Sequence, residues 1–369
     1  MAYYLVTGAM GFSGSTLTRQ LLEDGKDVIA MDRAQSFEGM EERFKVCKID
    51  PANPKLTLLS ADLLDPDSLK QLNEYDISHV FHVASLYDYS ATREALMAVN
   101  VEGTRNLLSW ALEADLKRFV HWSTCGVFGK PYTAAEGKKH NLPFDEKASS
   151  PKNTAMDAEG PDGTHLVNVY SESKWIQEKL LWKAYADNGL PLTVIRPAPI
   201  YGRGSRYGHG GIMLLIAKGL LRAIPSDAKN AVTTSVHVED VAGFARFVIE
   251  KKESIGEDYN VVDDSIISYR DFLHYIALVS GRRLWNVPGI RLSMYRAVAV
   301  PAAQFWTWLE RKFNFPKMQM LEVQSATYIG SSYWISNRKS KELGYQYRYP
   351  DVREGVRDTL AWFRETGDI

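Results

Sequence analysis

The chain has 369 residues, enough for two ordinary domains or for one large α/β domain with an appended lobe. Its 44 lysines and arginines are balanced by 45 aspartates and glutamates, so it lacks the positive excess typical of nucleic-acid binding, and we expect no nucleic-acid partner. Cys47 and Cys125 are too few for a disulfide framework or a cysteine-rich metal site, which favours a cytoplasmic location and predicts no metal site. The sequence shows no secretory signal and no apolar run long enough to span a bilayer.

Short apolar runs recur along the chain as far as residue 262, and each has the length of a buried strand. They comprise residues 3–6, 27–31, 56–59, 79–83, 118–122, 192–195 and 259–262. Segments with helical periodicity lie between most of them, including 92–116, 170–189 and 238–251. This alternation of strand and helix predicts an α/β fold built on a doubly wound parallel sheet.

The first strand leads into TGAMGFSG, which places Gly8, Gly11 and Gly14 three residues apart. A glycine-rich turn between a strand and a helix presents bare backbone N–H groups and a positive helix end to a pyrophosphate. The same glycines are also compatible with a tight turn that only packs the helix on the strand. Because a helical segment follows at once, we interpret the stretch as a dinucleotide-binding turn.

Acidic residues follow the second and third strands. Asp32 ends the second strand, where a carboxylate can accept hydrogen bonds from an adenosine ribose, and this favours NAD over NADP. Arg33 follows directly and could instead bind a 2′-phosphate. Asp62 and Leu63 close the third strand, where a carboxylate can meet the adenine amino group. The alternative for these two residues is a helix N-cap region before Asp65.

Two segments carry groups suited to proton transfer. Ser123 and Thr124, in WSTCGVFG, follow a predicted strand at the sheet edge where ligands bind in such folds, so a hydroxyl there could contact a substrate oxygen. Tyr170 and Lys174, in YSESK, are four residues apart on one face of a predicted helix. A neighbouring ammonium group stabilises a phenolate, which makes the phenol usable as an acid or base. The alternative is an exposed tyrosine and a solvated lysine on a surface helix.

From about residue 264 the composition becomes more aromatic and basic, with helical patterns at 268–280, 290–312 and 351–365. We interpret residues 1–263 as a dinucleotide-binding core and residues 264–369 as mainly a smaller substrate-binding lobe, to which insertions near 198–231 also contribute. The long loop 130–169 is rich in Gly, Pro, Asp and Lys, and loops of this length are commonly lids or disordered.

Taken in order, these motifs resemble those of the extended short-chain dehydrogenase/reductase family. The glycine turn is similar to the family's TGxxGxxG, and YSESK to its YxxxK pair. Further similar segments are HVAS at 82–85, NVEGT at 100–104, WSTCGVFG at 122–129, RPAPIYG at 196–202 and VHVEDVA at 236–242. The resemblance covers most of the chain and implies a Rossmann fold that binds NAD and, commonly in the family, forms a homodimer through helices 92–116 and 170–189.

The resemblance also implies roles for individual residues. Tyr170 would be the general acid/base, Lys174 would hold the nicotinamide ribose and lower the tyrosine pKa, and Thr124 would polarise the substrate oxygen. The expected cofactor contacts are Gly8, Met10, Gly11, Phe12, Gly14, Asp32, Arg33, Asp62, Leu63, Ala84, Ser85, Ser123, Tyr170, Lys174 and Pro197.

Departures from the family pattern narrow the substrate class. Cys125 and Gly126 follow Thr124, where the family's dehydratases carry Asp-Glu, so dehydration is disfavoured. Pro199 and Thr233 occupy positions where many sugar-nucleotide enzymes of the family carry an asparagine and an arginine for the diphosphate. The segment RPAPIYGRGSR and the closing segment 336–363 resemble 3β-hydroxysteroid and sterol-4α-carboxylate 3-dehydrogenases, which oxidise a secondary alcohol to a ketone.

We therefore expect an NAD-dependent oxidoreductase that acts on a bulky, apolar, sterol-like small molecule. The alternatives are a sugar-nucleotide epimerase that uses NAD as a bound cofactor, a long-chain 3-oxoacyl reductase, and a non-catalytic dinucleotide sensor. Segment 292–313 is apolar, but Arg296 and Pro301 interrupt it. It predicts either a half-buried helix that closes the substrate lobe or an interfacial helix that makes peripheral contact with a membrane.

Overall fold

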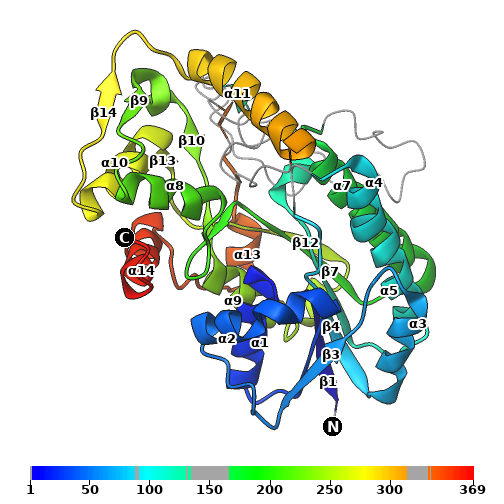
Figure 1. Cartoon of the computed structure of the whole chain (residues 1–369). Helices are drawn as coiled ribbons and strands as arrows, with labels where there is room; N and C mark the ends of the chain where they lie inside the picture. Colours follow the sequence, from blue (N-terminus) through cyan, green and yellow to red (C-terminus); the bar gives the residue numbers. More distant parts are fainter. Residues whose placement is uncertain (1, 88–90, 130–131, 134–165, 314–330, 333) are drawn as a thin grey trace.

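The computed structural model describes residues 2–87, 91–129, 132–133, 166–313, 331–332 and 334–369. Its centre is a seven-stranded sheet in the order β12-β7-β5-β4-β1-β2-β3, in which every neighbouring pair is parallel (Figure 1). The strands are β1 (Tyr3–Thr7), β2 (Val28–Asp32), β3 (Leu56–Ser60), β4 (Ile77–His82), β5 (Arg118–Trp122), β7 (Leu192–Pro197) and β12 (Glu257–Val261). The predicted doubly wound sheet is confirmed, with a strand at each of the predicted apolar runs.

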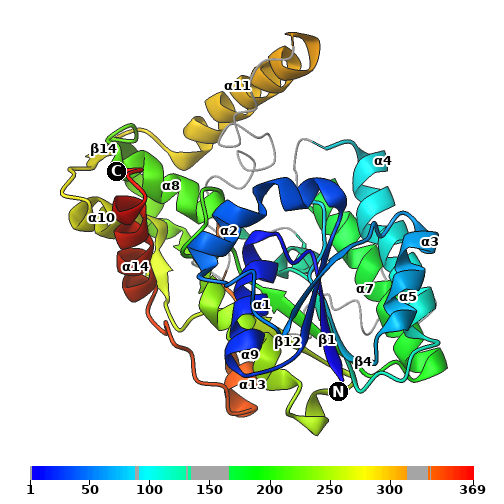
Figure 2. The ribbon, with the colours of Figure 1, turned by 60° about the horizontal axis from the view of Figure 1, so that its bottom comes forward.

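Helices cover both faces of this sheet, as Figure 2 shows. One face carries α1 (Phe12–Glu23), α2 (Met40–Cys47) and α9 (Val238–Val248), and the other carries α3 (Pro66–Leu69), α4 (Arg93–Leu96), α5 (Gly103–Ala111) and α7 (Val169–Asn188). Val6 packs in the core of the first face and Leu5 in that of the second. Because both faces of the strands are buried, the strands appear in the sequence as continuous apolar runs rather than as alternating ones.

The segment predicted as one helix over 92–116 changes its winding in the middle. A π-helical stretch, Met97–Glu102, joins α4 to α5, which ends at Ala111. The wider turn contains the fully buried Asn100, whose side chain bonds to residues of two other elements. Short π-helical stretches inside α-helices are frequent at functional sites.

A third hydrophobic core lies beside the sheet and joins α8 (Gly208–Ala217), α10 (Tyr269–Val279) and α14 (Val352–Glu365) through buried residues that include Met213, Phe272 and Phe363. Short strands connect the same regions. β10 (Val232–Thr233) pairs with β13 (Ile267–Ser268), and β9 (Ala223–Pro225) pairs with β14 (Trp285–Val287). These contacts support our proposal that residues 198–231 join 264–369 in one lobe, and the division of the chain into domains stays a prediction.

The lobe is hydrogen-bonded to the helices of the sheet at Asp240 on α9. The buried carboxylate of Asp240 accepts hydrogen bonds from the backbone N–H groups of Arg348 (2.6 Å) and Tyr349 (2.9 Å). β8 (Ile200–Tyr201) pairs with β11 (Val236–His237) directly before α9. These contacts anchor the chain that leads into α14.

The remaining β-strands and α-helices of the described residues are β6 (Tyr132–Thr133), β15 (Ser331–Ser332), α13 (Arg338–Glu342) and α11 (Leu292–Phe313). In Figures 1 and 2, α11 stands apart from the sheet, beyond α8 and β14. No helix among the described residues is long and apolar enough to cross a membrane. The predicted lid over 130–169 lies almost entirely outside the described residues.

Candidate active site

Two of the three glycines in the turn after β1 are required by the packing of the turn itself. Gly8 has a φ of +68°, and a Cβ there would lie 2.8 Å from the Ala84 Cα. A Cβ on Gly14 would lie 2.1 Å from the Gly8 carbonyl oxygen, so α1 packs against the strand only without a side chain. Gly11 differs, because it is exposed and its Cβ would come no closer than 3.1 Å to that oxygen. The tight-turn interpretation therefore holds for Gly8 and Gly14, while Gly11 stays open to a ligand.

The turn fits a dinucleotide at two further points. α1 begins directly after Gly11, and no side chain of the described residues caps it, so the positive end of the helix is open to an anion. Asp32 lies against the turn, with its carboxylate accepting hydrogen bonds from the N–H groups of Met10 (3.0 Å) and Arg33 (2.9 Å). The Arg33 side chain is exposed. Phe12, in the first turn of α1, lies near Gly204.

At the end of β3 the two predicted residues have different surroundings. Asp62 is exposed and its carboxylate accepts a hydrogen bond from the Leu64 N–H at 2.9 Å. Leu63 is buried, and its carbonyl accepts a hydrogen bond from Asn106. Asp65 is the N-cap of α3. Asp62 thus lies in the predicted capping region while keeping an exposed carboxylate at the sheet edge.

The loop after β4 is held in place by Asn100. The Asn100 Oδ1 accepts hydrogen bonds from the Leu86 N–H (2.7 Å) and the Ser85 hydroxyl (3.1 Å), and its Nδ2 donates to Ser173 on α7 (2.9 Å). Ala84 donates its N–H to Thr7 on β1. Thr7 therefore positions the predicted cofactor residue Ala84, and Asn100 positions the predicted cofactor residue Ser85. Asn100 belongs to the motif NVEGT, in which the sequence pattern assigned it no role; the signal in the sequence was a polar residue between apolar neighbours.

Tyr170 and Lys174 are both buried at the start of α7, with side chains exposed by 9% and 1%. Asn168 caps the helix, and its Oδ1 accepts a hydrogen bond from the Ser171 N–H at 2.8 Å. The Lys174 Nζ donates to the Trp122 carbonyl at 2.7 Å, which places it under the end of β5. Burial lowers the pKa of Lys174 to about 7, against the attraction of Glu178. The pair is therefore not a solvated feature of a surface helix.

The end of β5 brings Thr124 to the same place. Gly126 lies between this strand end and α7, because a Cβ on it would come within 2.7 Å of the Ser171 Oγ and 3.4 Å of the Thr124 Cγ2. The Thr124 Oγ1 accepts a hydrogen bond from the Gly126 N–H at 3.1 Å. Ser123 points elsewhere, since its hydroxyl donates to the buried Glu178.

Pro197 ends β7, the strand next to β5, and is buried. The structure therefore gathers Thr124, Tyr170, Lys174 and Pro197 at the carboxyl edge of the sheet, beside the glycine turn and the loop after β4. This edge is where ligands bind in doubly wound folds.

Two aromatic residues that the sequence patterns did not indicate, Tyr87 and Tyr207, form a chain of ring contacts that begins at Tyr170. The Tyr87 ring contacts Tyr170 edge to face, with centroids 5.0 Å apart, and contacts Tyr207 in the same way at 5.1 Å. The Tyr87 side chain is 49% exposed. These three residues, which we call the tyrosine cluster, present an aromatic surface next to the proposed acid/base. Loop aromatics carry no periodic signal, so sequence patterns do not reveal them.

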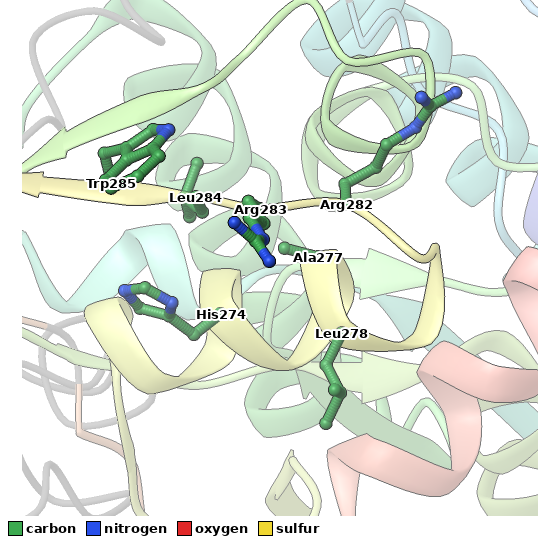
Figure 3. A pocket seen from close by; sticks show the side chains of 7 residues that line it. All are labelled: His274, Ala277, Leu278, Arg282, Arg283, Leu284 and Trp285. Atoms are coloured by element: carbon green, nitrogen blue, oxygen red, sulfur yellow. The ribbon is translucent and has the colours of Figure 1, made fainter.

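A separate shallow cavity of about 380 Å³ lies between α10 and β14 (Figure 3). Its lining includes Leu278, Arg282, Arg283 and Trp285, none of which is a predicted site residue. Leu278 and Trp285 are exposed. This cavity belongs to the lobe surface near the start of α11 rather than to the site around Tyr170.

Comparison with known proteins agrees with this geometry. A family model described as the NAD dependent epimerase/dehydratase family matches residues 4–261. A protein of Mycolicibacterium neoaurum named 3-beta-hydroxysteroid dehydrogenase is 26% identical over 99% of this chain and 92% of its own length. The Homo sapiens protein named short-chain dehydrogenase/reductase family 42E member 1 is 27% identical over 98% of this chain and 87% of its own.

Among solved structures, UDP-glucose 4-epimerase of Thermus thermophilus in complex with NAD superimposes with a TM-score of 0.68 at 21% identity, over 98% of this chain and 99% of that chain. This likeness shows the shared fold. The family match and the similarity to a named dehydrogenase make the protein an NAD(P)-dependent oxidoreductase. The chain belongs to the NAD-dependent epimerase/dehydratase family of extended short-chain dehydrogenases/reductases.

Proposed function

We propose that the protein oxidises a secondary alcohol on a bulky, apolar, sterol-like molecule and uses NAD as its cofactor. The observation that carries the proposal is the buried Tyr170–Lys174 pair at the end of β5, with the half-exposed ring of Tyr87 against Tyr170. Aromatic side chains offer apolar area with little loss of conformational freedom, which suits a rigid, fused-ring substrate. The similarity to a protein named 3-beta-hydroxysteroid dehydrogenase supports this substrate class.

Tyr170, Lys174 and Thr124 have separate roles in the proposed proton transfer. Tyr170 takes the proton from the substrate hydroxyl, and the ammonium group of Lys174 stabilises the phenolate form that does so. The Thr124 Oγ1 accepts a hydrogen bond from the Gly126 N–H, and we propose that its own hydroxyl hydrogen is donated to the substrate oxygen. NAD held at the glycine turn would supply the hydride acceptor for the carbinol carbon.

The dinucleotide would be held by the glycine turn, the start of α1 and Asp32. We propose NAD rather than NADP because the Asp32 carboxylate is fixed at the turn by two N–H groups, where a 2′-phosphate would meet its negative charge. Replacing Asp32 by Ala should shift the ratio of kcat/KM for NAD over NADP toward NADP by at least about tenfold. An unchanged ratio would argue against this role for Asp32.

A substrate panel tests the proposed reaction. Purified protein is given NAD with 3β-hydroxysteroids, long-chain 3-hydroxy acids and UDP-sugars, and NADH is followed at 340 nm. We expect steroid-dependent NADH formation and none with UDP-sugars. Conversion of a UDP-sugar without net NADH, by protein purified with NAD still bound, would favour the epimerase instead, while oxidation of 3-hydroxy acids alone would favour the 3-oxoacyl reductase.

We also propose that α11 contacts a membrane surface. Met294, Val298, Phe305 and Trp308 fall on one side of this helix by their spacing, and their side chains are 53%, 72%, 60% and 46% exposed. Leu292 and Ala303, on the opposite side, are buried. The exposed Arg291 and Lys312 lie near the two ends of the stripe, as in helices that rest on anionic lipid.

Flotation with anionic vesicles measures this contact. Val298→Glu and Phe305→Glu should each reduce the floating fraction, whereas Ile266→Glu, at a side chain of the lobe that is 66% exposed, should leave it unchanged. Equal flotation of all these variants would exclude α11 as the contact. We also propose a cytoplasmic location for the bound protein, because both of its cysteines, Cys47 and Cys125, are buried and neither forms a disulfide.

We propose a homodimer that pairs through the outer sides of α5 and α7. Leu112, the C-cap residue that follows α5, is 41% exposed although it is apolar. Leu112→Arg should convert the dimer to monomer in sedimentation analysis. A wild-type protein that sediments as a monomer at all concentrations would exclude the proposal.

A further inference from the structure

A chain of buried ionic contacts starts one helical turn after Lys174, at Glu178 on α7. The Glu178 carboxylate accepts hydrogen bonds from the Ser123 hydroxyl and from Arg196 on β7, at 3.1 Å from Nε and 2.8 Å from Nη2. Arg196 also pairs with Asp258 on β12 at 2.8 Å. Asp258 in turn forms an ion pair with Lys339 on α13, with 3.0 Å between its Oδ1 and the Lys339 Nζ. The network therefore runs across two strands, from beneath the active site to the protein surface.

With Lys174 protonated, the buried charges of this network and of Lys174 beside it are balanced. Lys174, Glu178, Arg196 and Asp258 are all buried, and with an ammonium on Lys174 they comprise two positive and two negative charges. Lys339, at the outer end of the network, is balanced by a further ion pair with Glu257 at 2.7 Å. An uncompensated buried charge is strongly unfavourable. The arrangement consequently favours the charged form of Lys174.

The other titratable groups that face Lys174 do not supply a counter-charge. His82 on β4 and His121 on β5 are fully buried, and burial together with the positive charge of Lys174 lowers the pKa of His82 to about 3 and that of His121 well below its ordinary value. Both imidazoles are therefore neutral. Arg196 is positive and paired with Glu178, and Tyr170 shares the helix of Lys174. Among the described residues, the carboxylate that raises the pKa of Lys174 is Glu178.

We propose that Glu178 is a positioning residue that keeps Lys174 protonated and holds the end of β5 through Ser123. In wild type the lysine then stays charged to a higher pH than it would without the Glu178 carboxylate. The kinetic consequence rests on the proposed function. The protonation of Lys174 is independent of the proposed function, and it is measured on the cofactor-free protein.

The test is an NMR titration of lysines labelled with ¹³C at Cε, with Lys174→Arg identifying the Lys174 signal. In Glu178→Gln we expect the Lys174 midpoint to fall by about 1 pH unit or more, a tenfold change in its protonation constant. Glu178→Asp, which keeps the charge, should restore most of it. Asp258→Asn, which removes the more distant buried carboxylate, should produce a smaller fall.

Kinetics supply the second readout. In Glu178→Gln the alkaline limb of kcat/KM for the alcohol should move to lower pH by the same amount as the NMR midpoint. A Lys174 midpoint equal to that of wild type in folded Glu178→Gln overturns the proposal. A shifted midpoint in a protein that oxidises no alcohol leaves this inference standing and refutes the proposed function.

A folding defect does not prevent the test. Replacing one member of a buried pair leaves the other unpaired, so Glu178→Gln is expected to be less stable than wild type. If it does not fold, Glu178→Gln combined with Arg196→Met removes both charges of the pair. The Lys174 midpoint is expected to fall in this variant too, and an unchanged midpoint there overturns the proposal equally.

Discussion

At Lys174, the requirements of the chemistry and of folding stability oppose each other. A lysine whose side chain is 1% exposed is held charged in the interior at the expense of folding free energy. Its ammonium group donates a hydrogen bond to the Trp122 carbonyl, and its pKa is lowered by burial. Such placement is typical of sites where a shifted pKa serves chemistry rather than packing.

Lys174→Met should show this opposition directly. Because the folded-state pKa of about 7 lies below the ordinary value of 10.5, the unfolded state binds more protons between these pH values, and wild-type stability gained from this group rises with pH. The methionine variant lacks that gain. Its Tm relative to wild type should therefore be highest near pH 6 and decline between pH 7 and 10, in calorimetry across this range. A difference that grows with pH would contradict the assigned shift.

Tyr87 provides a second prediction at this scale. Its half-exposed ring lies edge to face on Tyr170, so Tyr87→Ala should raise KM for a sterol-like substrate by about tenfold, with a smaller effect on kcat. Tyr87→Phe keeps the ring and should behave nearly as wild type. An equal KM for all three proteins would remove the tyrosine cluster from substrate binding.

Residues were predictable where a short motif carries the chemistry. Tyr170 and Lys174 stand in one helical turn, and their neighbourhood follows from spacing alone. Asn100, Tyr87 and Glu178 were not predictable in this way, because each acts through partners on elements far away in the sequence. The chemical roles of the predicted site residues stay predictions.

At the scale of elements, the turn between β1 and α1 combines two requirements in three glycines. Gly14 is needed for packing, since its Cβ would overlap the Gly8 carbonyl, whereas Gly11 has nearly enough room for a side chain. The strand and the helix could be predicted from apolar runs and periodicity. The distinction between the glycines could not, because it depends on the approach of backbone atoms.

Substitution by alanine separates these two requirements. Gly14→Ala should destabilise the protein by about 3 kcal/mol or fail to fold, because backbone must move to admit the Cβ. Gly11→Ala should change stability by less than about 1 kcal/mol yet weaken NAD binding severalfold. Chemical denaturation and NAD titration measure the two effects. Wild-type NAD affinity in a folded Gly11→Ala protein would argue against pyrophosphate contact at Gly11.

The helices show a similar limit to prediction. Hydrophobic spacing correctly indicated α7, α9, α10, α11 and α14. It did not indicate the π-helical stretch at Met97–Glu102, because one wide turn alters the apolar pattern too little to be recognised. Yet that turn contains Asn100, which holds the loop after β4.

At the scale of the whole molecule, the active-site edge of the sheet faces the lobe formed by the third hydrophobic core. The change in composition near residue 264 indicated such a lobe, and the pairing of β10 with β13 shows how segments before and after that point meet. Those pairings involve strands of two residues, which are too short to recognise in a sequence. Asp240 then secures the chain before α14 to the sheet side.

The central claim is that Tyr170 moves a proton during the NAD-dependent oxidation of a sterol-like alcohol. The most direct measurement compares wild type and Tyr170→Phe for NADH formation at 340 nm with a 3β-hydroxysteroid, alongside NAD affinity for both proteins. We predict steroid-dependent NADH formation in wild type and a loss of at least about a hundredfold in kcat for Tyr170→Phe, with NAD affinity within a factor of a few of wild type. Full activity in a folded Tyr170→Phe protein, or no steroid oxidation by wild type, would contradict the account.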